Sequence, residues 1–443
     1  MSQQTAILQT IEREGVQFID LWFTDILGIV KSVTIPASQL EGVIAHGSHF
    51  DGSSIDGFAR VAESDMELHP DLNTFRLLPW SAGETRTARL ICNAHNTQGE
   101  PFIGDPRNAL IRVIKQAEEA GYRFKVGMEM EFFLFRRREN GQQGVEPTEE
   151  ASYFDMPPEP MQNIRRQMVR VMDALDIRTH AIHSEIARGQ HEFEFAYDDA
   201  LTIADAMLTA RVAIKTVAQQ HGLFCTFMPR PITDQPGSGL HTHQSLHDIH
   251  TDDNIFSDSE QEYGLSDIAR YFLAGQLHHA RAMTAILAPL VNSYKRLGKS
   301  FEAPTYVTWA HVNRAALIRV PRPQPGREDH TRLELRCPDP SCNPYLAIAV
   351  MLKAGLDGIQ QKMTLQEPFE ETILGQKRSR LRNAAHLPTT LGDALDALRE
   401  DDVILDALGP YISDRFLEAK QQEFDQYNQI VTRWELDQYL GKY

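Results

Sequence analysis

The sequence has little of what several classes of protein require. Its 443 residues contain only four cysteines, too few for a disulfide framework, so we expect reduced, buried thiols. Cys337 and Cys342 are not accompanied by a second pair of Cys or His residues at the spacing of a zinc site. Basic residues are also scarce, since 44 Lys and Arg oppose 61 Asp and Glu and leave a formal net charge of -17. This charge argues against non-specific binding to nucleic acid or to anionic membranes.

Several sequence signals are absent as well. No apolar run approaches the length of about 18 residues that a transmembrane helix needs. The first residues, MSQQTAILQTIEREG, lack a basic segment followed by an apolar core, so we expect no signal peptide and a cytoplasmic protein. The chain has no GxxxxGK[ST], no GxGxxG after a strand and no G-x-S-x-G. A P-loop is therefore excluded, and a dinucleotide fold or a serine nucleophile elbow is unsupported.

The chain is long enough for two or three domains, and its 42% hydrophobic and 24% charged residues are typical of a globular protein. A helix is predicted from Ser2 to about Glu14, followed by a hairpin of strands at 16–23 and 29–36. The sequence stays rich in strands and loops until Asp105-Pro106, which is typical of a helix start. We therefore predict a small β-rich domain, 1–104, and a larger domain, 105–443.

In the larger domain, strands and helices follow one another. The patterns predict a strand at 123–135, short alternating strands later, and helices at 162–175, 199–222, 266–288 and 343–363. The fold class is α+β, with mostly antiparallel strands. The tail from Ser413 reads as helical, and its aromatic residues would be exposed unless something covers them: Phe416, Phe424, Tyr427 and Trp434.

Charged and polar side chains alternate with apolar ones along four predicted strands. Residues i and i+2 of a strand point to the same face, so each strand presents one apolar face and one reactive face. The side chains that share such a face are Glu129 and Glu131; Glu192 and Glu194, after Glu185; His241, His243 and Ser245; and Arg332, Glu334 and Arg336. A single Glu-x-Glu pair is more often a solvated sheet face, but four such segments in one domain favour a site.

Carboxylates that converge in this way need cations. Two carboxylates about 4 Å apart repel by roughly 4 kcal/mol at an effective dielectric constant near 20. Oxygen-rich ligands with one imidazole favour Mg²⁺ or Mn²⁺ over zinc. Arginines at 314, 319, 332 and 336 would bind phosphate or carboxylate groups. The residues thus predict a site that handles phosphate with divalent metals, beside a tight Gly237-Ser238-Gly239 turn.

The complete series of motifs resembles type I glutamine synthetase over nearly the whole chain. It comprises FTDILGIVK, FDGSSIDGF, ESDMELHPD, MEMEFFLF, EIARGQHE, GSGLHTHQSL, NSYKRL, NRAALIRVP and RLELRCPDPSCNPYLAIAVMLKAGLDGI. The resemblance implies an N-terminal β-grasp domain and a catalytic domain with a curved, mostly antiparallel sheet flanked by helices. It also implies ATP-dependent ligation of ammonia to L-glutamate through γ-glutamyl phosphate, with two or more Mg²⁺ or Mn²⁺. A homododecamer of two hexameric rings, with active sites between subunits, is expected.

The resemblance assigns roles to individual positions. One metal would be held by Glu131, Glu185 and Glu192, and the other by Glu129, His241 and Glu334. The positions on the ATP side are His243, Ser245, Arg314, Arg319 and Arg332. Those around glutamate are Gly237, Arg296, Glu302, Arg314 and Arg336. Asp51 would bind and deprotonate ammonium at a neighbouring subunit, Glu302 lies on a flap that closes over the intermediate, and Arg60 matches a position linked to feedback inhibition by glutamine.

Some positions depart from the family pattern. Pro236 precedes the glycine turn, the flap reads GKSFEAP, NRAAL replaces an NRSP-type sequence, and His180 and Asp329 stand where Glu and Lys are common. The absence of tyrosine between 364 and 410 removes the expected adenylylation site. Two alternatives therefore stay open: a γ-glutamyl ligase that uses a polyamine or ethanolamine, and a non-catalytic relative. Asp51 and Glu302, both anionic, together with Lys299 at the flap, favour ammonia.

Overall fold

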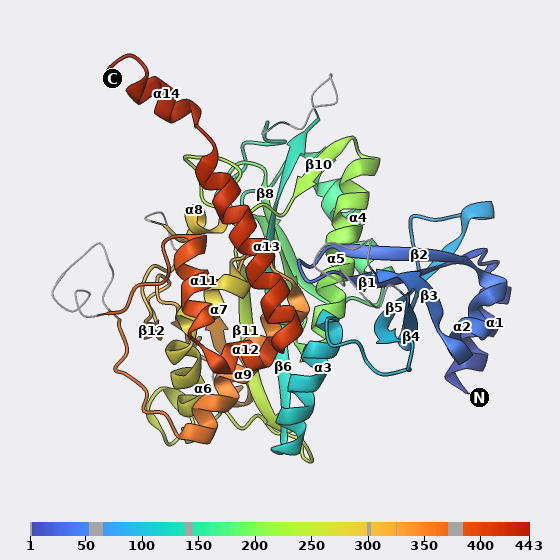
Figure 1. Cartoon of the computed structure of the whole chain (residues 1–443), viewed down its shortest axis with the longest axis horizontal. Helices are drawn as coiled ribbons and strands as arrows, with labels where there is room; N and C mark the ends of the chain where they lie inside the picture. The colour runs from blue at the N-terminus through green and yellow to red at the C-terminus, as the bar shows by residue number, and fades with distance from the viewer. Residues whose placement is uncertain are drawn as a thin grey trace.

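The computed structural model describes residues 2–52, 65–137, 144, 146–298, 303–324, 326–370 and 384–443. It places a small N-terminal domain with its own sheet beside a larger domain that holds a second sheet and most of the helices (Figure 1). The expected α+β class is confirmed. The proposed boundary near residue 104 falls in the segment between the last strand of the first sheet and the helix that opens the larger domain.

The N-terminal domain is a five-stranded sheet in the order β2-β1-β5-β4-β3. Strands β1 and β2 form the predicted antiparallel hairpin, whereas β1 and β5 run parallel. Helix α1 begins after Ser2, whose hydroxyl accepts from the Thr5 N–H, and ends at Gly15 with φ 64°. The elements are α1 Gln3–Glu14, β1 Phe18–Thr24, β2 Val30–Pro36, α2 Leu40–His46, β3 Ser48–Asp51, β4 Asp65–Leu77 and β5 Thr87–Asn96.

The larger domain is built on a nine-stranded sheet among the described residues, in the order β12-β13-β14-β11-β6-β8-β7, with β9 and β10 also paired to β6. Apart from the parallel pair β12 and β13, its strand pairs are antiparallel, as predicted. The strands are β6 Tyr122–Arg136, β7 Thr179–Ser184, β8 Gln190–Phe195, β9 Asp198–Asp199, β10 Leu223–Thr226, β11 Leu240–Asp248, β12 Trp309–Ala310, β13 Ile318–Arg319 and β14 Leu333–Leu335.

Helices cover this sheet and form the main apolar core with it. Helix α9 is buried along most of its length and packs against several other helices, so it is the centre of the helical layer. Asp105 caps α3 as predicted, because its carboxylate accepts from the Arg107 N–H. These helices are α3 Pro106–Glu119, α4 Glu159–Ala174, α5 Ala200–Gln220, α6 Asp267–His278, α7 Ala280–Leu287, α8 Ser293–Leu297 and α9 Pro344–Gln361.

The single helix predicted at 266–288 is wrong, because the structure has two helices, α6 and α7, that meet at His279. This residue has φ -89° and ψ 5°, outside the range of a regular helix. Its imidazole lies between two carboxylates, 3.1 Å from Asp357 and 2.7 Å from Asp401. Contacts with residues distant in sequence therefore accompany a break that the local apolar pattern does not reveal.

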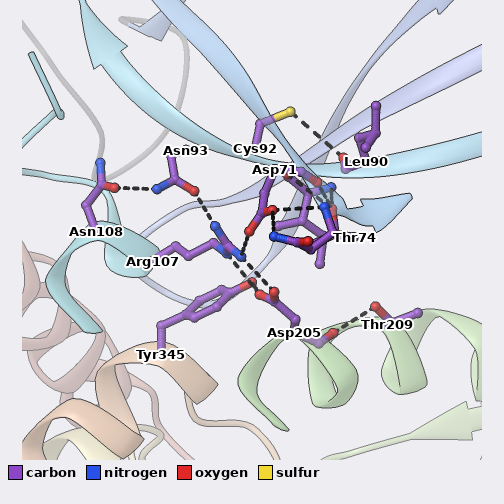
Figure 2. Close-up of polar contacts among 12 residues, drawn as sticks. Asp71, Thr74, Leu90, Cys92, Asn93, Arg107, Asn108, Asp205, Thr209 and Tyr345 are labelled. Carbon is purple, nitrogen blue, oxygen red and sulfur yellow. Dashed lines mark hydrogen bonds and ion pairs between the residues drawn. The ribbon is translucent and has the colours of Figure 1, made fainter. Parts of the chain in front are cut away.

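A buried polar network joins the two domains (Figure 2). Arg107 of α3 donates through Nη2 to Asp71 of β4 at 2.7 Å and to Asp205 of α5 at 2.8 Å. The Tyr345 hydroxyl of α9 donates to the same Asp205 carboxylate at 2.7 Å. Breaking such a network would leave buried charges without partners, so it holds the N-terminal sheet in a fixed position against the larger domain.

The C-terminal region is helical, as predicted, and consists of α11 Leu391–Arg399, α12 Asp402–Leu408, α13 Pro410–Gln429 and α14 Arg433–Tyr439. Of the four aromatic residues expected to be exposed, two are exposed and two pack into the protein. Phe416 is buried and Phe424 packs against the core, whereas Tyr427 and Trp434 stay exposed. Figure 1 shows α14 at the end of an arm that extends away from the rest of the chain. In the described part of the chain, no helix combines the length and the apolar character needed to cross a membrane.

Candidate active site

The register of the central strands brings the predicted acidic residues together. Glu131 of β6 lies opposite Glu192 of β8, and Glu129 of β6 lies opposite His241 of β11. On the other side of β11, His243 faces Glu334 of β14. Strand pairing alone therefore places these side chains on one patch of the sheet, as the alternation along each strand predicts.

Three overlapping groups of these side chains could each hold a metal ion, because their ligand atoms lie within 4.8 Å of one another. One group contains the three residues predicted for the second metal: Glu129, His241 and Glu334. The residues predicted for the first metal are divided between the other two groups: Glu131 with Glu192 and His241, and Glu185 with Glu192 and His183. Carboxylate oxygens with one or two imidazoles suit Mg²⁺ or Mn²⁺, so the donors present fit the expected cations.

The negative charge of the carboxylates near β7 and β8 is compensated only in part, mainly by His183. Burial would lower the pKa of His183, but its carboxylate neighbours raise it to about 10. Burial, together with the carboxylates of Glu131 and Glu192, raises the pKa of Glu185 to about 8. Burial also raises the pKa of Glu131 and of Glu192, and Arg296 and His183 offset this only in part. Without a cation, this part of the site gains by binding protons instead.

The carboxylates near β11 and β14 are compensated by the protein itself. Burial would raise the pKa of Glu334, but Arg336 and the two site histidines lower it to about 2. Arg336 donates to Oε1 of Glu334, and Arg319 donates to Oε2 at 2.7 Å. Burial would likewise raise the pKa of Glu129, yet its contacts with His241 at 3.0 Å and His243 at 2.7 Å hold it well below the usual range. These two glutamates are ionised at neutral pH.

A cavity of about 290 Å³ opens over this patch and carries the residues predicted around glutamate. Arg296 is buried in its wall and donates to three backbone carbonyls, those of Arg336, Cys337 and Pro338, at 2.9 to 3.1 Å. Gly237 lies where a Cβ would meet the Pro229 carbonyl at 2.1 Å, so the turn requires glycine. The predicted residues that line the cavity are Glu129, Glu131, Glu185, Glu192, Gly237, His241, Arg296, Arg314, Arg319, Glu334 and Arg336.

A second cavity of about 380 Å³ shares Glu129 with the first and contains three residues predicted on the ATP side: His243, Ser245 and Arg332. Arg332 donates to His243 Nδ1 at 3.2 Å, which couples the second cavity to Glu129. The Ser245 hydroxyl is buried between the Tyr197 hydroxyl and His247 Nε2. The two departures His180 and Asp329 also line this cavity. Its wall is less charged than that of the first cavity, as a site for a nucleotide base and ribose would be.

One predicted residue that the structure describes lies away from both cavities, and two others are not described. Asp51 lies on β3 in the N-terminal sheet, is exposed, and lines neither cavity among the described residues. Glu302 and Arg60 lie outside the described residues. The roles of these three positions therefore stay predictions.

The structure also adds residues that the sequence analysis missed. His183 precedes Glu185 by two positions, and its Nε2 lies 3.0 Å from Glu192. Gln190, the first residue of β8, donates to Glu131 at 2.6 Å and to the Gly237 carbonyl at 3.2 Å. Tyr153 and Phe154 line the first cavity. The alternation of β7 and β8 could have indicated His183 and Gln190, but no local pattern marks Tyr153 or Phe154.

Comparisons with known proteins agree with this geometry. Residues 15–97 match the family model of the glutamine synthetase β-grasp domain, and residues 103–439 match that of the glutamine synthetase catalytic domain. A glutamine synthetase from Halobacterium salinarum is 45% identical over 99% of this chain and 97% of its own length. One from Staphylococcus aureus is 45% identical over 98% of this chain and 97% of its own.

Solved structures give the same fold. A GmaS/ADP complex superposes with a TM-score of 0.88, at 31% identity over 98% of this chain and 99% of that chain. The ligand-free form of GmaS has a TM-score of 0.87 at 32% identity, again over 98% of this chain and 99% of that chain. The β-grasp and catalytic domains thus agree in fold as well as in sequence.

Proposed function

Because this chain belongs to the glutamine synthetase family of enzymes, we propose that it ligates ammonia to the γ-carboxylate of L-glutamate while ATP is converted to ADP and phosphate. One observation carries the proposal: an acidic cluster and a set of arginines line the same cavity, which adjoins a second cavity of nucleotide size. A site of this kind can neutralise a transferring phosphoryl group and hold a carboxylate beside it.

The proposed roles follow the positions of the side chains. One divalent cation would be held by Glu129, His241 and Glu334, whose ligand atoms form one group. The other would be held by Glu131, Glu185 and Glu192, which are divided between two overlapping groups. Both cations would neutralise phosphate charge. His243, Ser245 and Arg332 would bind ATP from the second cavity, and Arg314 and Arg319 its phosphates from the first. Gly237, Arg296 and Arg336 would hold glutamate.

The reaction would proceed in two steps. A γ-carboxylate oxygen of glutamate attacks the terminal phosphorus of ATP, the bond to the leaving ADP oxygen breaks, and γ-glutamyl phosphate forms. Ammonia nitrogen then attacks the acyl carbon, the bond between that carbon and the phosphate oxygen breaks, and phosphate leaves while the nitrogen gives up one proton. Ammonium must lose a proton to become the ammonia that attacks. We assign the removal of this proton to Asp51 of a neighbouring subunit. The acyl phosphate is hydrolysed easily by water, so closure of the site by the segment that contains Glu302 would protect it.

We propose a dodecamer of two hexameric rings for the assembly. Among the described residues, β3 is an edge strand of the N-terminal sheet, and Asp51 at its end would reach a site on another subunit. The end of the chain also exposes apolar side chains that a soluble monomer would normally cover: Ile430, Val431, Trp434, Leu436, Tyr439 and Leu440. Light scattering on the purified protein tests this proposal, and a catalytically active monomer would contradict it.

A γ-glutamyl ligase that uses a larger amine is the second candidate, because Pro236 lines the cavity beside Gly237 and can reshape its rim. Release of phosphate from ATP and glutamate should be measured with ammonium, putrescine, spermidine and ethanolamine in turn. We expect the highest kcat/KM with ammonium, and a higher value with any larger amine would replace the first proposal by the second. Asp51→Ala should raise the KM for ammonium and lower kcat while leaving the KM for ATP nearly unchanged.

A further inference from the structure

Two neighbouring aromatic side chains, Tyr153 and Phe154, form one wall of the first cavity, and nothing in the reaction described above uses Phe154. The two rings are in contact, with centroids 4.1 Å apart. The Phe154 ring also meets the His183 ring edge-on, with centroids 4.7 Å apart. We propose that Phe154 sets the size of the amine that this enzyme accepts, and that a buried network behind β7 holds its ring in place.

The backbone at Phe154 is in an unusual conformation. Residues 152–155 form a tight turn in which the Asp155 N–H donates to the Ser152 carbonyl at 2.9 Å. Phe154 is the third residue of this turn and has φ 59°, in the left-handed region where glycine or asparagine is normally found. A bulky residue persists in that region only where its surroundings hold it, and such positions cluster at functional sites. The sequence therefore keeps a phenylalanine where glycine would cost less conformational free energy, which points to a role for the ring.

The surroundings that hold the turn are buried. The Phe154 N–H donates to the Ser184 carbonyl of β7 at 3.1 Å, and the Ser184 hydroxyl donates to the Asp155 carbonyl at 3.1 Å. Arg165 of α4 in turn donates to the Ser184 hydroxyl at 2.6 Å and to Glu149, on the segment that leads into the turn, at 3.3 Å. Ser184 is completely buried, and Arg165 and Glu149 are nearly so. The turn is thus fixed to β7 and α4 on both sides of Phe154.

The order of the strands indicates which substrate meets this wall. Arg319 lies on β13 and Arg336 directly follows β14, toward one edge of the sheet, and both would face the anionic glutamate and phosphate groups. Glu192 lies on β8 and Glu185 follows β7, toward the other edge, beside the aromatic wall. An amine is a cation in water, and carboxylates and aromatic faces attract cations. The amine would therefore approach from the side that Phe154 restricts, and this step rests on the proposed function.

The test compares two substitutions that both remove the Phe154 ring. They differ in the free energy that the left-handed backbone conformation costs at this position. Phe154→Gly and Phe154→Ala both open space, whereas only glycine adopts the left-handed conformation without strain. Values of kcat/KM are measured with ammonium, methylamine and ethylamine under saturating ATP and glutamate. We expect both variants to raise the ratio of methylamine to ammonium by about tenfold, since one methyl group in a hydrophobic pocket changes kcat/KM by that order. The Tm of the glycine variant should equal or exceed that of the wild type, and the alanine variant should melt lower.

Two further variants complete the experiment. Ser184→Ala removes the hydroxyl that links Arg165 to the turn, so it should shift the ratio in the same direction by about two- to threefold. Met156→Ala changes an exposed side chain just beyond the turn that lines neither cavity, and should leave the ratio at the wild-type value. An unchanged ratio in both Phe154 variants overturns the inference, while wild-type turnover of ammonium still supports the proposed function. An unchanged ratio in Ser184→Ala overturns the positioning by the network, and a wild-type enzyme that already prefers ethylamine overturns both proposals.

Discussion

The two sides of the acidic cluster differ in how their charge is balanced. On the β11–β14 side, Glu334 contacts Arg319 and Arg336, and its pKa falls to about 2 although it is buried. On the β7–β8 side, Glu185 faces other carboxylates, and its pKa rises to about 8. The same residue type, at similar burial, is thus a stable anion on one side and a proton acceptor on the other. This difference teaches that side chains of the protein balance most of the negative charge on the β11–β14 side. On the β7–β8 side, His183 lies closest to Glu185 and Glu192 as a compensating cation, and an excess of negative charge is left for a bound metal to balance.

The largest expected effect comes from removing charge on the compensated side. Glu334→Gln leaves the buried guanidinium of Arg336 and its neighbour Arg319 without their carboxylate, and breaking a buried pair in this way costs about 3 kcal/mol. We therefore expect the free energy of unfolding of the metal-free protein to fall by about that amount, measured by urea denaturation. Turnover should fall by at least about a thousandfold, because a metal ligand is lost as well.

The matching substitution on the other side should have the opposite effect on stability. Glu185→Gln removes a carboxylate that is repelled by Glu131 and Glu192, so the metal-free protein should keep its stability or gain about 1 kcal/mol at pH 8. Turnover should fall by about a hundredfold or more, and the protection of the fold by Mn²⁺ should weaken. A loss of stability as large as that of Glu334→Gln would show that the two sides do not differ in the way described.

The pH dependence sharpens the same comparison. The pKa of Glu185 is about 8 in the folded protein, above its ordinary value of 4.5, so the folded state binds more protons than the unfolded state between these two pH values. The contribution of this group to stability is therefore present at low pH and is lost as pH rises toward 8. We expect the Tm of the metal-free protein to fall between pH 5.5 and 8 by more in the wild type than in Glu185→Gln. Saturating Mn²⁺ should reduce the difference, because the metal replaces the proton.

Much of this arrangement could be predicted from the sequence, because a strand has a period of two. The alternation in MEMEFF, QHEFEF, LHTHQS and RLELR is enough to place the charged side chains on common faces, and the strand register then brings them together. The aromatic wall could not be predicted, because Tyr153 and Phe154 reach the cavity from a turn that is held by β7 and α4. The break at His279 was missed for a similar reason, since its carboxylate partners Asp357 and Asp401 are distant in the sequence. Local patterns predict faces, whereas loops and breaks depend on contacts made only in the folded chain.

The smallest expected effect lies outside both sides of the cluster, at Ser245 in the second cavity. Its hydroxyl is buried between the Tyr197 hydroxyl and His247, and it carries no charge, so Ser245→Ala removes hydrogen bonds worth about 1 kcal/mol without changing the balance of charge. If this cavity binds ATP, the KM for ATP should rise by about fivefold, and the KM for glutamate and the Mn²⁺ affinity should stay within twofold of the wild type. Glu129 lies at the junction of the two cavities, and Glu129→Gln should by contrast weaken both ATP and metal binding. Initial rates at varied ATP, with calorimetric titration of Mn²⁺, distinguish the two patterns. If Ser245→Ala weakened ATP and Mn²⁺ binding equally, the second cavity and the acidic cluster would act as a single site.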